Sequence, residues 1–229
     1  MRERPLSASS VKTYLQCLLK YYYHYEDKKP REGKSGPLAF GIAIHRALEY
    51  LHGAVSQTGE SPGPKLYDEV LKLFMQEATA NGLDDASIYQ EGRDMLISRL
   101  DGIDPQEKIL GLELEFHLKT PAGTPYTGSI DKLIELDEET VVIVDYKTSR
   151  MALSQGEADT DIQMSMYDLA VSELFPQYKT IICAFDYLRL SEVVTHRTPE
   201  QRQVFVEFLG IGAVLAEFLD QFAIGRMGE

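Results

Sequence analysis

The sequence VVIVDYKT, residues 141–148, carries the strongest structural signal in the chain. Its β-branched run, Val141 to Val144, predicts a strand that is buried on both faces in the middle of a sheet. Side chains alternate along a strand, so Asp145 and Lys147 should project from one face and Tyr146 from the other. Packing alone gives a core strand no reason to end in an aspartate and a lysine. The end of this strand is therefore a candidate functional site.

A second acidic residue, Asp131, lies in the preceding expected strand, within the sequence GSID at 128–131. The short turn at 137–139 would pair the two strands as a hairpin and bring Asp131 close to Asp145 and Lys147. Hard divalent cations such as Mg²⁺ or Mn²⁺ prefer carboxylate oxygens, and a bound ion polarises a phosphoryl oxygen and activates water. A neighbouring lysine can neutralise charge in the transition state. The hairpin thus predicts a metal-dependent phosphodiester-cleaving site, although Asp-x-Lys alone also describes an ordinary salt bridge at a strand end.

The rest of the sequence predicts helices on both sides of these strands. Ser7 to Ser10 can cap the first helix, and Thr198-Pro199-Glu200-Gln201 is a capping box for the last. Helices are expected over about 9–25, 38–56, 65–80, 86–101, 162–175 and 198–222, and polar loops at 26–37 and 149–160. Strands are expected over about 109–119, 127–136, 140–148, 179–189 and 191–197. This order predicts an α/β protein in one domain, residues 1–229, with a mainly helical portion at 1–105 and an αβ core with a C-terminal helix at 106–229.

The composition is that of an ordinary globular protein of 229 residues. No apolar run approaches the ~18 residues that span a bilayer, so we expect no membrane contact. The N-terminus lacks the apolar core of a secretory signal, which favours a cytoplasmic protein. Cys17 and Cys183 are too few for a disulfide framework or a four-cysteine metal site.

The net charge of −13 disfavours a nucleic-acid partner, because phosphate binding usually needs a basic surface. Residues 1–50 instead carry a net positive charge, with nine Lys or Arg against five Asp or Glu. Here Lys20, Lys28 and Lys29 surround the aromatic run at 21–25, YYYHY, where cations could follow phosphates and rings could stack on bases. The alternative that we favour for most of these tyrosines is packing against the core. A bound Mg²⁺ would also cancel part of the negative field at a carboxylate site.

Two pairs of residues on expected helices could reach the same point. Gly41 and His45 lie four apart on one helix face; the glycine would allow a close approach, and a neutral histidine can bind a metal. Gln163 and Tyr167 lie one turn apart on the helix that follows the Asp-x-Lys strand, where an amide and a hydroxyl could hold a phosphate or the attacking water. Each pair alone has an ordinary explanation, as a hydrogen-bonded histidine or as surface polar residues.

Taken together and in order, these residues resemble the PD-(D/E)XK nuclease superfamily, in particular the RecB-type and CRISPR-associated exonucleases. The resemblance covers nearly the whole chain. The matching segments are Leu6–Val11 with Tyr14, Cys17 and Tyr21–Tyr25, then Gly41–His45, Gly128–Asp131, Asp145–Lys147, and Gln163 with Tyr167. The resemblance implies a restriction-endonuclease-like core, a central mixed β-sheet flanked by helices, with an N-terminal helical portion.

The resemblance also implies roles for single residues. The implied ligands of Mg²⁺ or Mn²⁺ are His45, Asp131, Asp145 and the backbone carbonyl of Tyr146. Relatives often place a further acidic residue just upstream, a position that Glu113 or Glu115 could fill. Lys147 would position or activate water, while Gln163 and Tyr167 would contact the DNA backbone or orient the lysine.

Several RecB-like nucleases hold an iron–sulfur cluster on one N-terminal and three C-terminal cysteines. Cys17 matches the first of these, but residues 190–229 contain no cysteine, and Leu18 replaces the usual proline. A cluster needs four ligands, so we expect no iron–sulfur cluster in this chain.

The expected function is that of a metal-dependent DNase. It is expected to act as an exonuclease on single strands or DNA ends, in recombination, repair, phage biology or CRISPR adaptation. The chain has no helicase motor, so unwinding would need a partner protein such as a helicase. Two alternatives stay open: a non-catalytic nuclease-fold module that binds DNA or protein, and an unrelated metal-dependent phosphohydrolase acting on small substrates.

Overall fold

The computed structural model describes residues 4–27, 36–100 and 102–211. Within these residues five strands form one mixed sheet in the order β1-β2-β3-β4-β5. The strands are β1 (Lys108–Lys119), β2 (Pro125–Asp137), β3 (Thr140–Lys147), β4 (Thr180–Tyr187) and β5 (Val193–His196). The strand with the β-branched run, β3, is central, antiparallel to β2 and parallel to β4. The predicted hairpin and the predicted mixed sheet are both confirmed.

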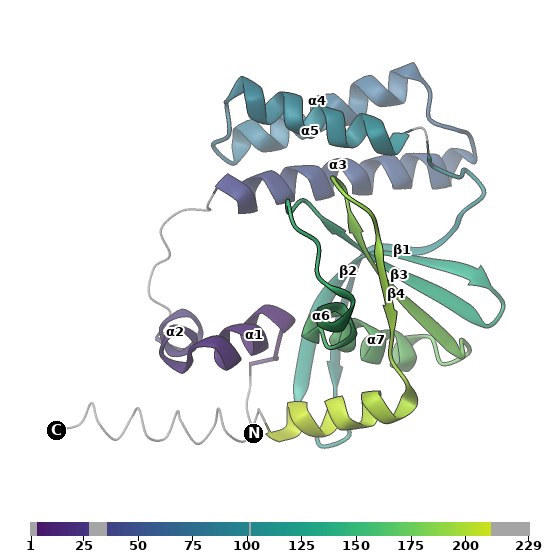
Figure 1. Cartoon of the computed structure of the whole chain (residues 1–229). Coiled ribbons are helices and arrows are strands. Elements are labelled where there is room, and N and C mark those ends of the chain that lie inside the picture. Colours follow the sequence, from purple (N-terminus) through teal and green to yellow (C-terminus); the bar gives the residue numbers. More distant parts are fainter. Residues whose placement is uncertain (1–3, 28–35, 101, 212–229) are drawn as a thin grey trace.

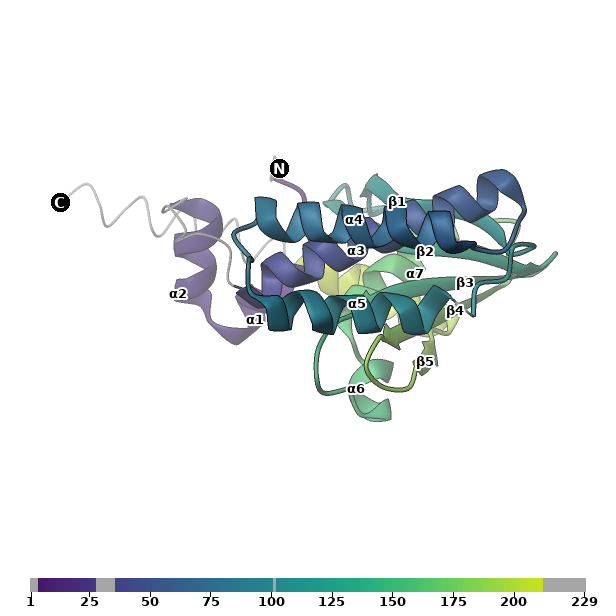
Figure 2. The same cartoon turned by 90° about the horizontal axis from the view of Figure 1, so that it is seen from above.

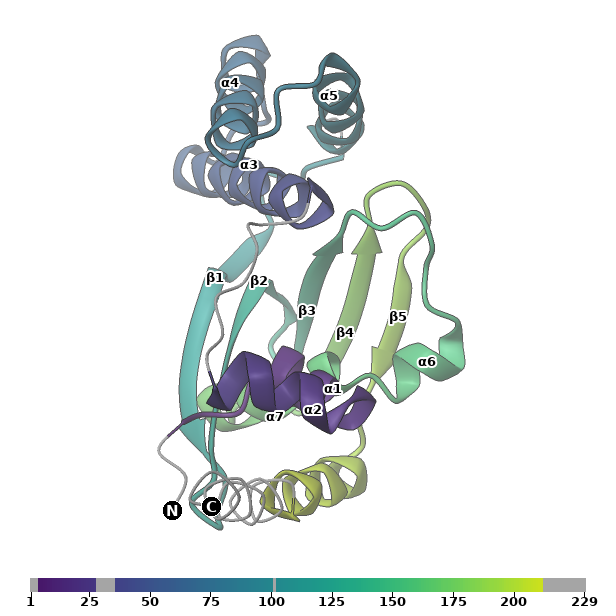
Figure 3. The ribbon, with the colours of Figure 1, turned by 90° about the vertical axis from the view of Figure 1, so that its left-hand side faces the viewer.

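Helices cover the sheet on two sides. They are α1 (Ala8–Gln16), α2 (Leu18–Tyr21), the π-helical turn η1 (Tyr22–Glu26), α3 (Gly36–Thr58), α4 (Pro64–Ala80), α5 (Ala86–Leu100), α6 (Gln155–Asp159) and α7 (Ile162–Leu174). Figures 1 and 3 show α3 lying across the end of the sheet at which β3 and β4 finish, with α4 and α5 beyond it. Seen from above, α4 and α5 lie on either side of α3 (Figure 2). Among the described helices, none is both long enough and apolar enough to cross a membrane.

The alternation of side chains along β3 assigns its two faces to two hydrophobic clusters. Val141 and Ile143 belong to the cluster that includes α7, whereas Val144 and Tyr146 belong to the cluster that includes α3, α4 and α5. Asp145 continues the first face, so its side chain points to the side of the sheet on which α7 lies. The two faces of one strand thus direct its polar end toward two different layers of helices.

The prediction of one continuous helix over about 9–25 is wrong. Cys17 is extended, with φ −162° and ψ 109°, and separates α1 from α2. With this break, the rings of Tyr14 and Tyr21 pack edge to face, with their centroids 5.3 Å apart. The ring centroids of Tyr21 and Tyr25 are 5.1 Å apart. Tyr21 and Tyr25 are buried, whereas Tyr22 is half-buried and Tyr23 is exposed, so burial holds for two of the four tyrosines of this run and not for most of them.

The loop expected over 149–160 is wrong in its second half, because α6 begins at Gln155. Ser154 and Glu157 form a capping box there, a Ser-x-x-Glu signal that the sequence displays. The last helix begins as predicted: Thr198 and Gln201 form reciprocal hydrogen bonds of 2.8 and 3.2 Å between side chain and backbone. This helix is described up to residue 211, and the remainder of its predicted span lies outside the described residues.

Candidate metal centre and active site

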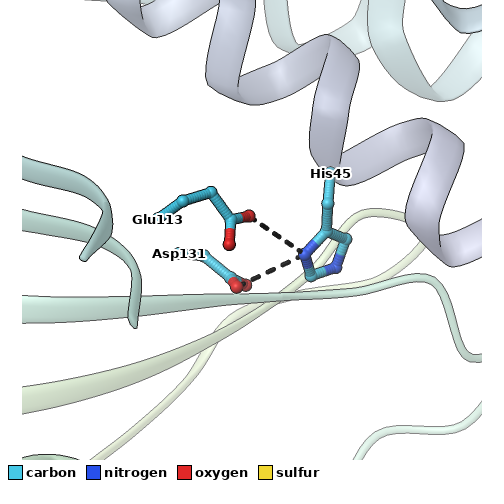
Figure 4. Close-up of side chains that lie close together, drawn as sticks. All are labelled: His45, Glu113 and Asp131. Atoms are coloured by element: carbon cyan, nitrogen blue, oxygen red, sulfur yellow. Dashed lines mark ion pairs between the residues drawn. The ribbon is translucent and has the colours of Figure 1, made fainter. Parts of the chain in front are cut away.

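His45 projects from α3 toward the sheet where β2 and β3 run side by side. Its Nε2 atom lies 3.0 Å from the backbone carbonyl oxygen of Tyr146. Its Nδ1 atom lies 3.3 Å from Asp131 Oδ1 and 3.9 Å from Glu113 Oε1, as Figure 4 shows. A carbonyl oxygen only accepts hydrogen bonds, so Nε2 is the donor in this contact. The helix therefore brings an imidazole into contact with a peptide carbonyl and two acidic side chains.

The pairing of β2 with β3 places Asp131 beside Asp145, since Lys132 pairs with Val144. The backbone N–H of Tyr146 donates a hydrogen bond of 2.7 Å to Asp131 Oδ2. This contact fixes the carboxylate and leaves Oδ1 directed at His45. The expected convergence of Asp131 with the Asp-x-Lys strand is present.

Glu113 on β1 completes the acidic group. Its φ of 43° lies in the left-handed region, which costs a residue other than glycine about 1–3 kcal/mol and is often found at functional sites. The Ser129 hydroxyl donates to Glu113 Oε2 at 3.2 Å. Of the two glutamates that the sequence left open, Glu113 lies beside His45 and Asp131, whereas Glu115 is exposed and borders the same cavity.

A second network links β3 to α7. Gln163 Nε2 donates to Asp145 Oδ1 at 2.8 Å and to the Tyr167 hydroxyl at 2.9 Å. Its Oε1 atom accepts from Lys147 Nζ at 3.0 Å. Lys147 Nζ also lies 2.5 Å from Asp145 Oδ2. Gln163 thereby holds the aspartate, the lysine and the tyrosine in one arrangement, and the capped start of α7 at Asp161 places it there.

Both groups border one cavity of about 570 Å³. Arg46 and Ser149 also line it, and the sequence had not singled out either residue. Gly41 lies there too, and no backbone atom of the described residues makes the close approach expected at this glycine; the approach of a ligand to it stays a prediction. An added Cβ would sit 3.7 Å from Thr148 Oγ1, which is an ordinary contact.

Burial and mutual repulsion shift the ionisation of the acidic residues. Burial raises the pKa of Asp145 to about 6, and Lys147 opposes part of this shift. Burial and the charge of Asp131 raise the pKa of Glu113. Burial acts to lower the pKa of His45, but its hydrogen bond and charge interaction with Asp131 outweigh burial and raise it. Without a metal ion, these three groups therefore keep their protons to higher pH than the same groups would in water.

The residues of this site fit a hard divalent cation. Ligand atoms of His45, Glu113 and Asp131 lie within 4.8 Å of one another. Asp145 Oδ2 is buried and has no partner in hydrogen-bond geometry among the described residues, even though Lys147 Nζ is close to it. Carboxylate and carbonyl oxygens with one imidazole are donors that Mg²⁺ or Mn²⁺ accepts. An ion here would replace the positive charge of a protonated His45.

We expect the affinity for Mn²⁺ to fall as the pH is lowered from about 8 to about 5. The pKa values of Asp145, Glu113 and His45 are raised, so each group holds its proton when the pH is below its raised pKa. A metal ion that binds at such a pH must displace those protons. For each proton that must be displaced, the affinity for the metal falls about tenfold for every unit by which the pH is lowered. Calorimetric titration with Mn²⁺ across this range, in two buffers of different ionisation enthalpy, measures both affinity and proton release. An affinity that stays constant over the range contradicts the prediction.

Gly128 supports the site through packing. An added Cβ at residue 128 would lie 2.6 Å from Phe116 Cζ and 3.1 Å from Tyr167 Cε1. We therefore expect Gly128→Ala to force these rings apart, to destabilise the fold by about 1–3 kcal/mol and to displace the Tyr167 hydroxyl from Gln163. The measurements are the thermal midpoint and, at a temperature where the variant is folded, the affinity for Mn²⁺. Gly156→Ala is the matched control, because nothing lies within 4 Å of its added Cβ; equal effects of both substitutions would refute this role of Gly128.

The lysines expected to bind nucleic acid are only partly described. Lys20 is exposed on α2, next to the aromatic run. Lys28 and Lys29 lie outside the described residues. A contact between these lysines and DNA therefore stays a prediction.

Comparison with known proteins assigns the chain to a family. A model of the PD-(D/E)XK nuclease superfamily matches residues 5–214. The chain belongs to this superfamily. Its Asp131, Asp145 and Lys147 stand in the order acid, acid, x, lysine that gives the PD-(D/E)XK nucleases their name.

One solved structure shows the same fold at low sequence identity. The crystal structure of a candidate exonuclease from Eubacterium rectale has a TM-score of 0.55 and 11% identity, over 90% of this chain and 77% of the other. A second structure, of a protein named SSO0001, has 15% identity over 89% and 88% of the two chains, but its TM-score of 0.31 is too low to bear on the fold. No curated protein matches this PD-(D/E)XK nuclease.

Proposed function

We propose that this PD-(D/E)XK nuclease is a Mg²⁺- or Mn²⁺-dependent deoxyribonuclease, and specifically an exonuclease that acts on single-stranded DNA or DNA ends. The observation that carries the proposal is that His45, Asp131, Asp145 and Lys147, from three separate elements, meet at one cavity. The fold shared with a candidate exonuclease supports the proposal of exonuclease action. A DNA-processing role in repair, recombination, phage biology or CRISPR adaptation, with a helicase or similar partner, is part of the proposal.

In this proposal His45, Asp131, Asp145 and the Tyr146 carbonyl hold the metal ion, with Glu113 as an additional ligand. A bound divalent ion supplies Lewis acidity and lowers the pKa of a water molecule. The peptide N–H of Tyr146 keeps Asp131 oriented, and Gln163 keeps Asp145 oriented. Preorganised ligands of this kind bind an ion without first rearranging.

Lys147 is the group that we propose to act on the reacting phosphate. Phosphodiester hydrolysis forms a bond between water oxygen and phosphorus and breaks the bond to the leaving nucleoside oxygen, which takes up a proton. The Lys147 ammonium can neutralise the negative charge that develops on the phosphate during this exchange. Burial acts to lower the pKa of Lys147, but Asp145 outweighs that effect, so the lysine stays charged. Gln163 fixes its direction, and Tyr167 fixes Gln163.

The test is a substrate panel. The purified protein is incubated with end-labelled single-stranded DNA, linear duplex, closed circular DNA and RNA, each with Mg²⁺, with Mn²⁺ and with a chelator. The proposal predicts metal-dependent mononucleotide or short-oligonucleotide products from linear DNA and no cleavage of the closed circle. Cleavage of circles would replace the exonuclease assignment with an endonuclease assignment. DNA binding without cleavage under all conditions would favour the non-catalytic module.

A further inference from the structure

The main chain of Tyr146 contacts the site on both sides of its Cα atom. Its N–H donates to Asp131 Oδ2 at 2.7 Å, and its carbonyl oxygen accepts from His45 Nε2 at 3.0 Å. Both polar contacts of this residue with the site are therefore made by backbone atoms. The position of its peptide groups determines where an acidic ligand and a carbonyl ligand lie.

The side chain of Tyr146 points to the opposite face of the sheet and meets His52 of α3. The hydroxyl lies 2.8 Å from His52 Nε2, and the two rings are nearly parallel, with an interplanar angle of 15°. Both side chains are buried. Burial, reinforced by Lys132, lowers the pKa of His52 to about 3, so this imidazole is neutral in the working range of pH.

The surroundings of His52 make Tyr146 its hydrogen-bond partner. A neutral imidazole carries one N–H and one acceptor nitrogen, so Nε2 can pair with a hydroxyl in either tautomer. Glu107 Oε2 lies 3.9 Å from His52 Nδ1, too far for a hydrogen bond, and Glu107 is itself paired with Lys132 at 3.0 Å. Among the described residues Nδ1 has no hydrogen-bond partner, so the bond between Nε2 and the Tyr146 hydroxyl is the one that orients this buried ring.

His45 and His52 lie seven residues apart, two turns along the same side of α3. One contacts the carbonyl of Tyr146 and the other contacts its hydroxyl. The helix therefore holds this single residue of β3 at two separated points. This pair of contacts is called the histidine clamp below.

We propose that His52 is a positioning residue of the nuclease: through the Tyr146 hydroxyl it fixes the peptide groups of Tyr146 and thereby the geometry of the metal site. The inference rests on the proposed function where it concerns metal binding. Partners that orient metal ligands typically contribute 10–100-fold to metal affinity or activity, although His52 itself touches neither the ligand atoms nor the reacting phosphate.

The test compares Tyr146→Phe and His52→Leu with the wild type. Each substitution removes one partner of the hydrogen bond, and we expect Mn²⁺ affinity and kcat to fall by about tenfold or more, with little change in KM for DNA. The matched control is Tyr50→Phe, which removes a tyrosine hydroxyl of the same helix that bonds Glu69 at 2.8 Å, away from Tyr146. Thermal melting of each variant sets the temperature at which all are folded.

A second measurement does not depend on metal or on catalysis. Amide hydrogen exchange at Tyr146 reports its N–H bond to Asp131. In Tyr146→Phe and His52→Leu we expect this amide to exchange faster relative to that of Ile143 in the same strand. A purely structural loss would accelerate both amides alike. His52→Gln should restore protection and metal affinity, because its amide can still accept or donate at the position of Nε2.

The outcomes separate the clamp from the proposed function. If Tyr146→Phe keeps wild-type metal affinity and amide protection, the clamp is refuted whatever the nuclease assay shows. A wild-type protein that cleaves no DNA refutes the proposed function, yet faster Tyr146 exchange in the variants would still support the clamp. In the double variant Tyr146→Phe with His52→Leu, effects no larger than those of the single changes support one shared interaction; fully additive effects contradict it.

Discussion

Replacement of Lys147 by methionine is expected to lower kcat by about 10²–10³-fold, because it removes the positive charge directed at the developing phosphate charge. Methionine preserves most of the apolar stem and removes the ammonium group, whose Nζ atom lies 5.7 Å from the centroid of the Phe185 ring. Lys147 is not a metal ligand in the proposed site, so Mn²⁺ affinity should stay close to that of the wild type or increase. The measurement is single-turnover cleavage of end-labelled single-stranded DNA at saturating metal.

The matched control is Lys179→Met. Lys179 is largely exposed and pairs with Glu139 at the turn between β2 and β3, remote from the cavity lining. Its replacement should leave kcat within about twofold, because surface ion pairs contribute little. If Lys147→Met cleaves DNA within a few-fold of the wild type, the lysine has no catalytic role and the proposed mechanism fails.

For Asp145→Asn we expect the metal site itself to be lost. Asparagine keeps the shape and can still accept from Gln163, but it removes a charged ligand that is buried at the centre of the site. Substitution of a residue that only orients a metal ligand lowers metal affinity or activity by about 10–100-fold. Loss of a ligand itself should therefore lower the affinity for Mn²⁺ by more than about 100-fold. Calorimetric titration measures the affinity at about pH 8, which is above the pKa of about 6 of the Asp145 carboxyl.

Asp145→Asn also leaves the Lys147 ammonium without its closest counter-charge, so stability must be measured alongside affinity. Asp84→Asn, at an exposed position outside the cavity lining, controls for loss of one negative charge from an acidic protein. Metal binding by folded Asp145→Asn that equals binding by Asp84→Asn would remove Asp145 from the ligand set.

The sequence was sufficient to predict those parts of the site that depend on local patterns of residues. The alternation of Val141 to Lys147 predicted which side chains share a face, and the turn at 137–139 predicted that Asp131 would lie beside Asp145. The contact of His45 with Asp131 and with the Tyr146 carbonyl depends on how α3 crosses the sheet. No periodicity encodes that crossing, and only the resemblance to a family suggested it.

Other features could not be predicted from the sequence, for physical reasons. The break at Cys17 accompanies a contact between the Tyr14 and Tyr21 rings, which lie on either side of it, and the helical periodicity of the segment does not encode such a contact. The choice between Glu113 and Glu115 depends on a positive φ at Glu113, which turns its side chain toward His45. The Ser154–Glu157 capping box is visible in the sequence and marks the start of α6. His52 could have been noticed as the residue two turns beyond His45 on one helix.

The two hydrophobic clusters that meet at β3 have a consequence for the candidate site. His45 belongs to the helical layer of α3, while Gln163 and Tyr167 belong to α7 on the opposite face. Both clusters must therefore be in place before His45 from α3 and Gln163 from α7 can border the same cavity. The candidate site depends on the packing of both faces of the sheet, so a substitution that loosens either cluster should disturb it even when no site residue is changed.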